Sequence, residues 1–163
     1  MLQIYNLFKS NLKKGSFKSL EFLVTDICTI INSDPNKILS DLNDLKVIAW
    51  NEKYYNKKRI NSVTTDDFDM YVNSWLPNQK TAIQDHPQHG RLICLIDGTL
   101  EEKIYNKKLE LIEKKIIKGP CIRYIDNSIG YQTIQCVKKA VSLEIYSPGR
   151  FRPFLMAVIE EKK

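Results

Sequence analysis

Apolar residues recur at helical spacing in the first third of the chain. Three sets follow one another: Leu2, Ile4, Leu7, Phe8 and Leu12; then Leu20, Phe22, Leu23, Ile27, Ile30 and Ile31; then Ile38, Leu39, Leu42 and Leu45. Residues 13–15, Lys-Lys-Gly, are typical of a helix end, and Asp34-Pro35 is typical of an N-cap with proline in the first helical position. The pattern therefore predicts three helices within residues 1–49.

From about Trp50 the apolar period changes from 3.6 residues to two, which is the period of β-strands. Turn signals, among them Pro77-Asn78, Asp97-Gly98 and Asn127-Ser128, divide this part into short segments. Ten strands are predicted: 59–63, 68–75, 81–86, 92–96, 99–105, 110–115, 121–125, 131–138, 141–146 and 154–160. A helical lead followed by many short strands predicts a mostly β protein, with the strands forming a sandwich or a closed barrel.

Composition and charge narrow the class of protein. A chain of 163 residues is long enough for one domain with a real core. The net charge is +6, but the lysines are scattered rather than gathered in one basic stripe, so no nucleic-acid partner is expected. Four cysteines stand singly, and no run approaches about 18 apolar residues. We expect reduced thiols, no membrane partner and a soluble, cytoplasmic protein.

Two groups of polar residues repeat with the period of a strand. Gln84 and His86 are two apart, and so are Ser142, Glu144 and Tyr146. Residues at i and i+2 share one face of a strand, so each group lies together on one side. From spacing alone, these faces either line the interior of a barrel or turn to water.

Four segments resemble, in order and spacing, the cysteine dioxygenase family of cupins. They are residues 75–87 (WLPNQKTAIQDHP), 95–102 (LIDGTLEE), 124–130 (YIDNSIG) and 140–148 (AVSLEIYSP), within a likeness that covers about 54–149. The resemblance implies a mostly β fold, a cupin β-barrel (double-stranded β-helix) with an N-terminal α-helical cap. Residues 1–163 would form a single domain, with the cap at 1–49 and the barrel at 50–163. The resemblance also implies an Fe(II) ion held by three histidines, and a reaction that adds oxygen to the sulfur of a thiol substrate.

Carried over position by position, the family's metal-binding histidines are mostly replaced. Its first and second histidines fall on Gln84 and His86, and its third falls on Gln132. The histidine of its Ser-x-His-x-Tyr strand falls on Glu144, whereas Ser142 and Tyr146 are retained. Amide oxygens are weaker ligands of Fe(II) than imidazole, so these replacements predict weaker iron binding.

The resemblance also places the end of the site that holds the substrate's carboxylate. The family's arginine, two residues after a tyrosine, falls on Lys57 after Tyr55, with Arg59 as the alternative. Lysine keeps the charge but lacks the planar fork of arginine, which favours a changed ligand. Lys57 also fits a simple solvated run of lysines at 53–58. The cysteine that crosslinks to tyrosine falls on Gly90 or Arg91, so no crosslink is expected.

Two chemistries remain open at these positions. A mixed nitrogen and oxygen site suits Mn, Zn or weakly held Fe, and its candidate metal ligands are His86, Gln84, Gln132 and Glu144. A site without metal would instead use Glu144 with His86 as an acid–base pair. The candidate catalytic residues are Glu144, Tyr146, Ser142 and His86, and the candidate substrate-binding residues are Lys57, Arg59, Tyr55, Gln84 and Gln132.

The leading prediction is an enzyme of thiol-dioxygenase ancestry with a rebuilt or lost metal site. Its ligand is expected to be a small, polar, anionic metabolite. Two alternatives stay open: a non-catalytic cupin that binds a metabolite or a protein partner, and a genuine Fe-dependent thiol dioxygenase. We expect a monomer or a small homo-oligomer. Its cofactor is Fe(II), another divalent metal or none.

Overall fold

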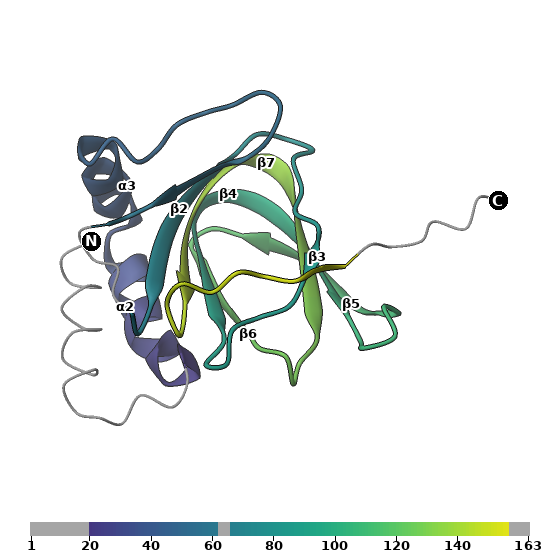
Figure 1. Ribbon diagram of the computed structural model, residues 1–163. Helices are drawn as coiled ribbons and strands as arrows, with labels where there is room; N and C mark the ends of the chain where they lie inside the picture. The colour runs from purple at the N-terminus through teal and green to yellow at the C-terminus, as the bar shows by residue number, and fades with distance from the viewer. Residues whose placement is uncertain (1–19, 62–65, 157–163) are drawn as a thin grey trace.

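The structure is a computed structural model, and it describes residues 20–61 and 66–156 (Figure 1). Its elements are η1 (Leu20–Leu23), α2 (Val24–Ser33), α3 (Pro35–Asp44), β1 (Asn56–Arg59), β2 (Asp69–Trp75), β3 (Ile83–Gln84), β4 (Arg91–Tyr105), β5 (Leu111–Lys118), β6 (Cys121–Ile125), β7 (Tyr131–Tyr146) and β8 (Leu155–Met156). The helix predicted over Leu2–Leu12 lies outside the described residues.

The two α-helices pack on one face of the curled sheet, as Figure 1 shows for α2 and α3 beside β2. Asp34 caps α3, its side chain accepting a hydrogen bond from the backbone N–H of Lys37 at 2.9 Å, which confirms the predicted N-cap. Ile27, Ile31 and Leu42 are buried in a cluster with sheet residues. Within the described part of the chain, no helix is long and apolar enough to span a membrane.

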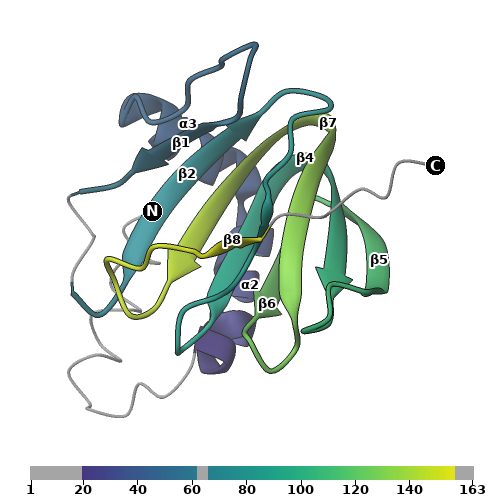
Figure 2. The ribbon, with the colours of Figure 1, turned by 45° about the vertical axis from the view of Figure 1, so that its right-hand side comes forward.

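The described strands form an eight-stranded sheet that curls on itself (Figure 2). Its path runs β1-β2-β7-β3-β8, and β4 pairs with β5, β6 and β7. The two long strands, β4 and β7, pair antiparallel along most of their length, from Arg91 opposite Tyr146 to Tyr105 opposite Tyr131. This central pair brings residues 26 to 55 positions apart in the sequence onto one surface.

The prediction of separate strands at 92–96 and 99–105 is wrong, and so is that of separate strands at 131–138 and 141–146. Each pair is one continuous strand, β4 and β7. Asp97-Gly98 is an irregularity inside β4, where the register with β7 shifts. Gly98 has φ +96°, and a Cβ there would lie 2.3 Å from the carbonyl oxygen of Lys139. Gly98 therefore forms part of a β-bulge within β4, where it pairs with β7, and not a turn between two strands.

Other strand bounds differ from the prediction to varying degrees. β6 agrees with the predicted strand at 121–125, and the strand predicted at 81–86 shrinks to Ile83–Gln84. The strand predicted at 59–63 shares only Arg59 with β1 (Asn56–Arg59), and residues 62 and 63 lie outside the described part of the chain. The short β3 has a local cause. The N–H of His86 donates to Oδ1 of Asn127 at 2.9 Å, and Nδ2 of Asn127 donates to the His86 carbonyl at 2.8 Å. The side chain of Asn127 thus replaces a neighbouring strand as the hydrogen-bond partner of the His86 backbone.

Alternation along β4 divides the buried residues between two faces. Leu92, Cys94 and Ile96 belong to the cluster that includes the helices, and Ile93 and Leu95 belong to a second cluster on the opposite face. The second cluster also contains Trp75, Leu100, Ile117, Ile134, Cys136 and Ala140. Apolar side chains therefore fill part of the barrel interior. The polar residues of the candidate site lie on this same interior face.

Candidate functional site

Arg91 is the centre of a buried polar cluster in the barrel. It opens β4 and lies opposite Tyr146 of β7, so Glu144 is its diagonal neighbour on the same face. Its Nη2 lies 2.8 Å from Oε1 of Glu144, and both side chains are 1% exposed. Its Nη1 donates a hydrogen bond to Oε1 of Gln132 at 3.1 Å. The guanidinium therefore links two of the candidate residues, Glu144 and Gln132.

Gln132 extends this cluster toward the other end of the barrel. Its Nε2 donates to Oε1 of Glu102 at 2.6 Å, and Oε2 of Glu102 accepts from Nε of Arg123 at 2.8 Å. Both ends of the Gln132 amide are thus engaged. Arg123 neutralises Glu102, so the part of the cluster formed by Gln132, Glu102 and Arg123 carries no net charge.

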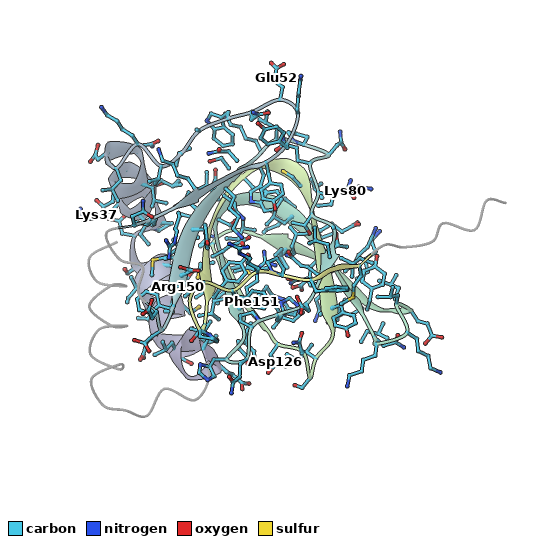
Figure 3. The ribbon with its side chains drawn as sticks, in the orientation of Figure 1. Lys37, Glu52, Lys80, Asp126, Arg150 and Phe151 are labelled. Atoms are coloured by element: carbon cyan, nitrogen blue, oxygen red, sulfur yellow. The ribbon has the colours of Figure 1, made fainter. Side chains whose placement is uncertain are left out.

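Tyr146 and Lys57 close the cluster on the opposite side. The Tyr146 hydroxyl donates to Oε2 of Glu144 at 2.6 Å and accepts from Nζ of Lys57 at 3.0 Å. Lys57 Nζ also lies 4.3 Å from the ring centroid of Tyr71 and 4.4 Å from that of Tyr146. Phe151, labelled in Figure 3, stacks on Tyr146 with the ring centroids 6.4 Å apart. Lys57 is therefore tied to Glu144 through a single phenol.

The charges of this cluster control one another's protonation. Burial raises the pKa of Glu144, but the positive charges of Arg91 and Lys57 outweigh burial, and its pKa lies below the usual range. Lys57 is an exposed residue, and its ammonium lies against two aromatic rings. Desolvation, with the charge of Arg91 adding to it, lowers the pKa of Lys57 to about 8 although Glu144 opposes the shift.

His86 is buried without a partner for its ring. It is 2% exposed, and among the described residues neither Nδ1 nor Nε2 has a hydrogen-bond partner. Burial, followed by the charge of Arg91, lowers the pKa of His86 to about 3. The imidazole is therefore neutral at pH 7. Gln84, two residues before it, is also buried and lies opposite Gln132 in the β3–β7 pair.

The remaining candidate residues are placed elsewhere. Oγ of Ser142 accepts a hydrogen bond from Nε1 of Trp75 at 3.0 Å, and Tyr55 stacks on Trp75 with ring centroids 4.2 Å apart. Arg59 forms an ion pair with Asp69 at 2.6 Å and is 41% exposed, so the structure does not bring it into the Arg91 cluster. Ser142 and Tyr55 thus help to position Trp75 in the interior.

The predicted sites omit three residues of this cluster, Arg91, Glu102 and Arg123. A sequence signal was present for Arg91, which shares the parity of Ile93 and Leu95 at the start of a strongly apolar strand. A charged residue on the inward face of such a strand needs a partner. Glu102 has the same parity as the buried Leu100 and Ile104.

The donor set does not fit the iron site that the resemblance implies. Glu144 accepts from Tyr146 and is paired with Arg91, and the amide of Gln132 is fully used. His86 is the one imidazole in the candidate set, and the described residues contain no group of three His, Cys, Asp or Glu able to hold a metal ion. The guanidinium of Arg91 lies against two of the candidate ligands, Glu144 and Gln132, and its positive charge repels a metal ion.

Two hollows on the described part of the molecule lie away from Arg91. One, of about 370 Å³, is lined by residues of the opposite strand parity, including Glu101, Lys103 and Thr133. The other, of about 450 Å³, lies between α3 and the bend of β7, beside Trp50 and Lys139. Neither is lined by a candidate site residue.

Comparison with known proteins identifies the fold. No protein-family profile matches the chain, and no curated protein is significantly similar to it. Among solved structures, an uncharacterized conserved protein with a double-stranded β-helix domain from Klebsiella pneumoniae is similar with TM-score 0.57 and 16% identity, over 69% of this chain and 93% of that one. A cupin superfamily protein from Desulfitobacterium hafniense gives TM-score 0.51 and 10% identity, over 61% and 83%.

Oxalate decarboxylase from Bacillus subtilis is also similar, with TM-score 0.53 and 14% identity, over 68% of this chain and 30% of that one. At these identities the likeness concerns the fold alone. It points to cupins in general and not to the cysteine dioxygenase family in particular. The chain has the cupin fold, a curled, mostly β double-stranded β-helix with two helices near its N-terminus.

Proposed function

We propose that this cupin binds a small anionic metabolite at the Arg91 cluster, without a metal ion. The carrying observation is an excess of positive charge. Arg91 and Lys57 face the single carboxylate of Glu144, so this half of the cluster carries about one net positive charge at pH 7. A buried charge without a counterion is costly, and a monoanionic ligand would compensate it.

Unpartnered polar atoms at the same place support a ligand of this kind. Nε of Arg91 is buried and has no hydrogen-bond partner among the described residues, and neither ring nitrogen of His86 has one. Buried polar groups in folded proteins are nearly always hydrogen-bonded. A carboxylate would accept from Arg91, and a neighbouring hydroxyl or carbonyl group would satisfy the neutral imidazole of His86.

Ancestry within the thiol dioxygenases is part of the proposal, because residues at the family's site positions, Gln132, Glu144, Tyr146 and Lys57, are joined in one network. The family's iron chemistry is not part of the proposal, because the candidate ligands do not fit an iron ion. Acid–base catalysis is also less well supported than binding. Oε2 of Glu144 accepts a hydrogen bond from Tyr146, whereas Oε1 is ion-paired with Arg91 without a hydrogen bond, and the lowered pKa makes the carboxylate a weak base.

Binding can be tested by isothermal titration with lactate, oxalate and the neutral lactamide, all of them small. Oxalate is included because the structurally similar oxalate decarboxylase is named for that substrate. We expect lactate to bind and lactamide not to bind. Lys57→Met should weaken lactate binding by up to about fivefold, since it removes a charge contact of up to about 1 kcal/mol. The matched control is Lys58→Met, because Nζ of Lys58 instead bonds to the Lys46 carbonyl. Equal affinity for lactate and lactamide would refute the charge argument.

A metal test separates this proposal from its main rival. Adding Fe(II) or Mn(II) to metal-free protein under anaerobic conditions should leave the thermal midpoint unchanged and give no stoichiometric binding. A midpoint that rises with added metal, and that falls again with chelator, would favour a rebuilt metal site over the proposed anion site.

A further inference from the structure

Lys57 combines an exposed position with a desolvated amine. It lies on β1 at the edge of the sheet path, where the residue is exposed. Its Nζ contacts the rings of Tyr71 and Tyr146 and donates a hydrogen bond to the Tyr146 hydroxyl. Lys57 is therefore an exposed residue whose amine is packed against two aromatic rings. Binding of an anion uses only the charge of this group and leaves its nucleophilicity without a role.

We propose that Lys57 forms an imine with a carbonyl group, and that the anionic ligand of the barrel is a small 2-oxo acid. The inference rests on the proposed anion-binding function and names the ligand class. A 2-oxo acid carries its carboxylate and its ketone on adjacent carbons. Lys57 Nζ and Cζ of Arg91 lie against the same Tyr146 ring, at 4.4 and 5.2 Å from its centroid. The Tyr146 ring is thus a shared neighbour of the guanidinium that would bind the carboxylate and of the amine that would attack the ketone.

The chemistry balances without any further reactant. The unprotonated amine of Lys57 attacks the carbonyl carbon, a C–N bond forms, and the carbonyl oxygen takes up protons and leaves as water. Starting from the ammonium form, the products are a protonated imine and one water molecule. Tyr146, hydrogen-bonded to both Nζ and Glu144, is placed to move protons between the amine and the departing oxygen.

The cluster favours the unprotonated amine that this step needs. Desolvation and the charge of Arg91 lower the pKa of Lys57, whereas the charges of Glu144 and Asp69 oppose them, and the result is about 8. About a tenth of the amine is then unprotonated at pH 7, compared with less than about a thousandth for an ordinary lysine. Lys58, its neighbour in sequence, is exposed and hydrogen-bonded to the Lys46 carbonyl, and it serves as the internal control.

The test is reductive trapping. Full-length protein is incubated with pyruvate and cyanoborohydride at pH 7, and modified lysines are identified by peptide mass spectrometry. We expect a reduced pyruvate adduct on Lys57 in at least about tenfold excess over Lys58. Lys57→Arg keeps the positive charge and removes the nucleophile. It should give no excess adduct at this position, whereas the control Lys58→Arg should keep both lactate binding and the adduct on Lys57, and circular dichroism verifies that both variants fold.

The possible outcomes distinguish failure of imine formation at Lys57 from failure of anion binding at the Arg91 cluster. Binding of lactate and pyruvate without an adduct on Lys57 would leave the anion site in place and refute imine formation. Equal trapping of pyruvate and of the uncharged carbonyl propanal would refute the assignment of 2-oxo acids. Adducts spread evenly over the exposed lysines, with no binding of lactate, would overturn both proposals.

Discussion

Removing Arg91 should destabilise the protein more than most substitutions. Arg91→Met deletes the cation and leaves Glu144, 1% exposed, in the interior with only the more distant Lys57 for compensation. Breaking a buried ion pair by removing one partner costs about 3–5 kcal/mol. For a protein of this size, each kcal/mol lowers the thermal midpoint by about 2–4 °C, so the expected decrease is about 6–20 °C.

A double-mutant cycle isolates the pair from its surroundings. Glu144→Gln removes the charge and keeps an oxygen that can accept the hydrogen bond from the Tyr146 hydroxyl. Arg91→Met combined with Glu144→Gln removes both charges, so the double variant should be more stable than the sum of the two single losses predicts. We expect a coupling free energy of about 2–3 kcal/mol. The assay is urea unfolding followed by far-ultraviolet circular dichroism, with m-values compared among variants.

Two results would refute this reasoning. An Arg91→Met variant that loses less than about 1 kcal/mol would mean that Glu144 is solvated or compensated by another group. Additive losses in the cycle would mean that the two charges do not interact, whatever their separation.

Three further predictions concern single positions. Asp34→Ala should cost about 1 kcal/mol in urea unfolding, because the Lys37 N–H at the start of α3 loses its acceptor. Acidification from about pH 6.5 to 3 should destabilise the fold, because the pKa of His86 is about 3 when folded and 6.5 when unfolded, so the unfolded chain binds more protons. The loss at low pH is up to about 5 kcal/mol, and His86→Asn should reduce the pH dependence by that amount. Gly98→Ala should cost more than about 1 kcal/mol by thermal unfolding, because its Cβ would clash with the Lys139 carbonyl.

The sequence by itself determined the features that depend on neighbouring residues. Asp34-Pro35 marks the start of α3 because the cap is a local hydrogen bond. The two-residue spacing of Ser142, Glu144 and Tyr146 puts them on one face of β7, since side chains alternate along any strand, and the structure places Leu143 and Ile145 on the other face with the helices. The resemblance to cupins added the overall fold.

Only the tertiary structure decided what surrounds those side chains. Arg91 meets Glu144 because β4 and β7 pair in a register that sets Arg91 opposite Tyr146, and local spacing does not specify that register. The same pairing makes Asp97-Gly98 a bulge, although the dipeptide is equally suited to a turn. Charges pair through space between residues that are far apart in the chain. The central position of Arg91 therefore follows from the pairing of β4 with β7 and could not be predicted from local sequence.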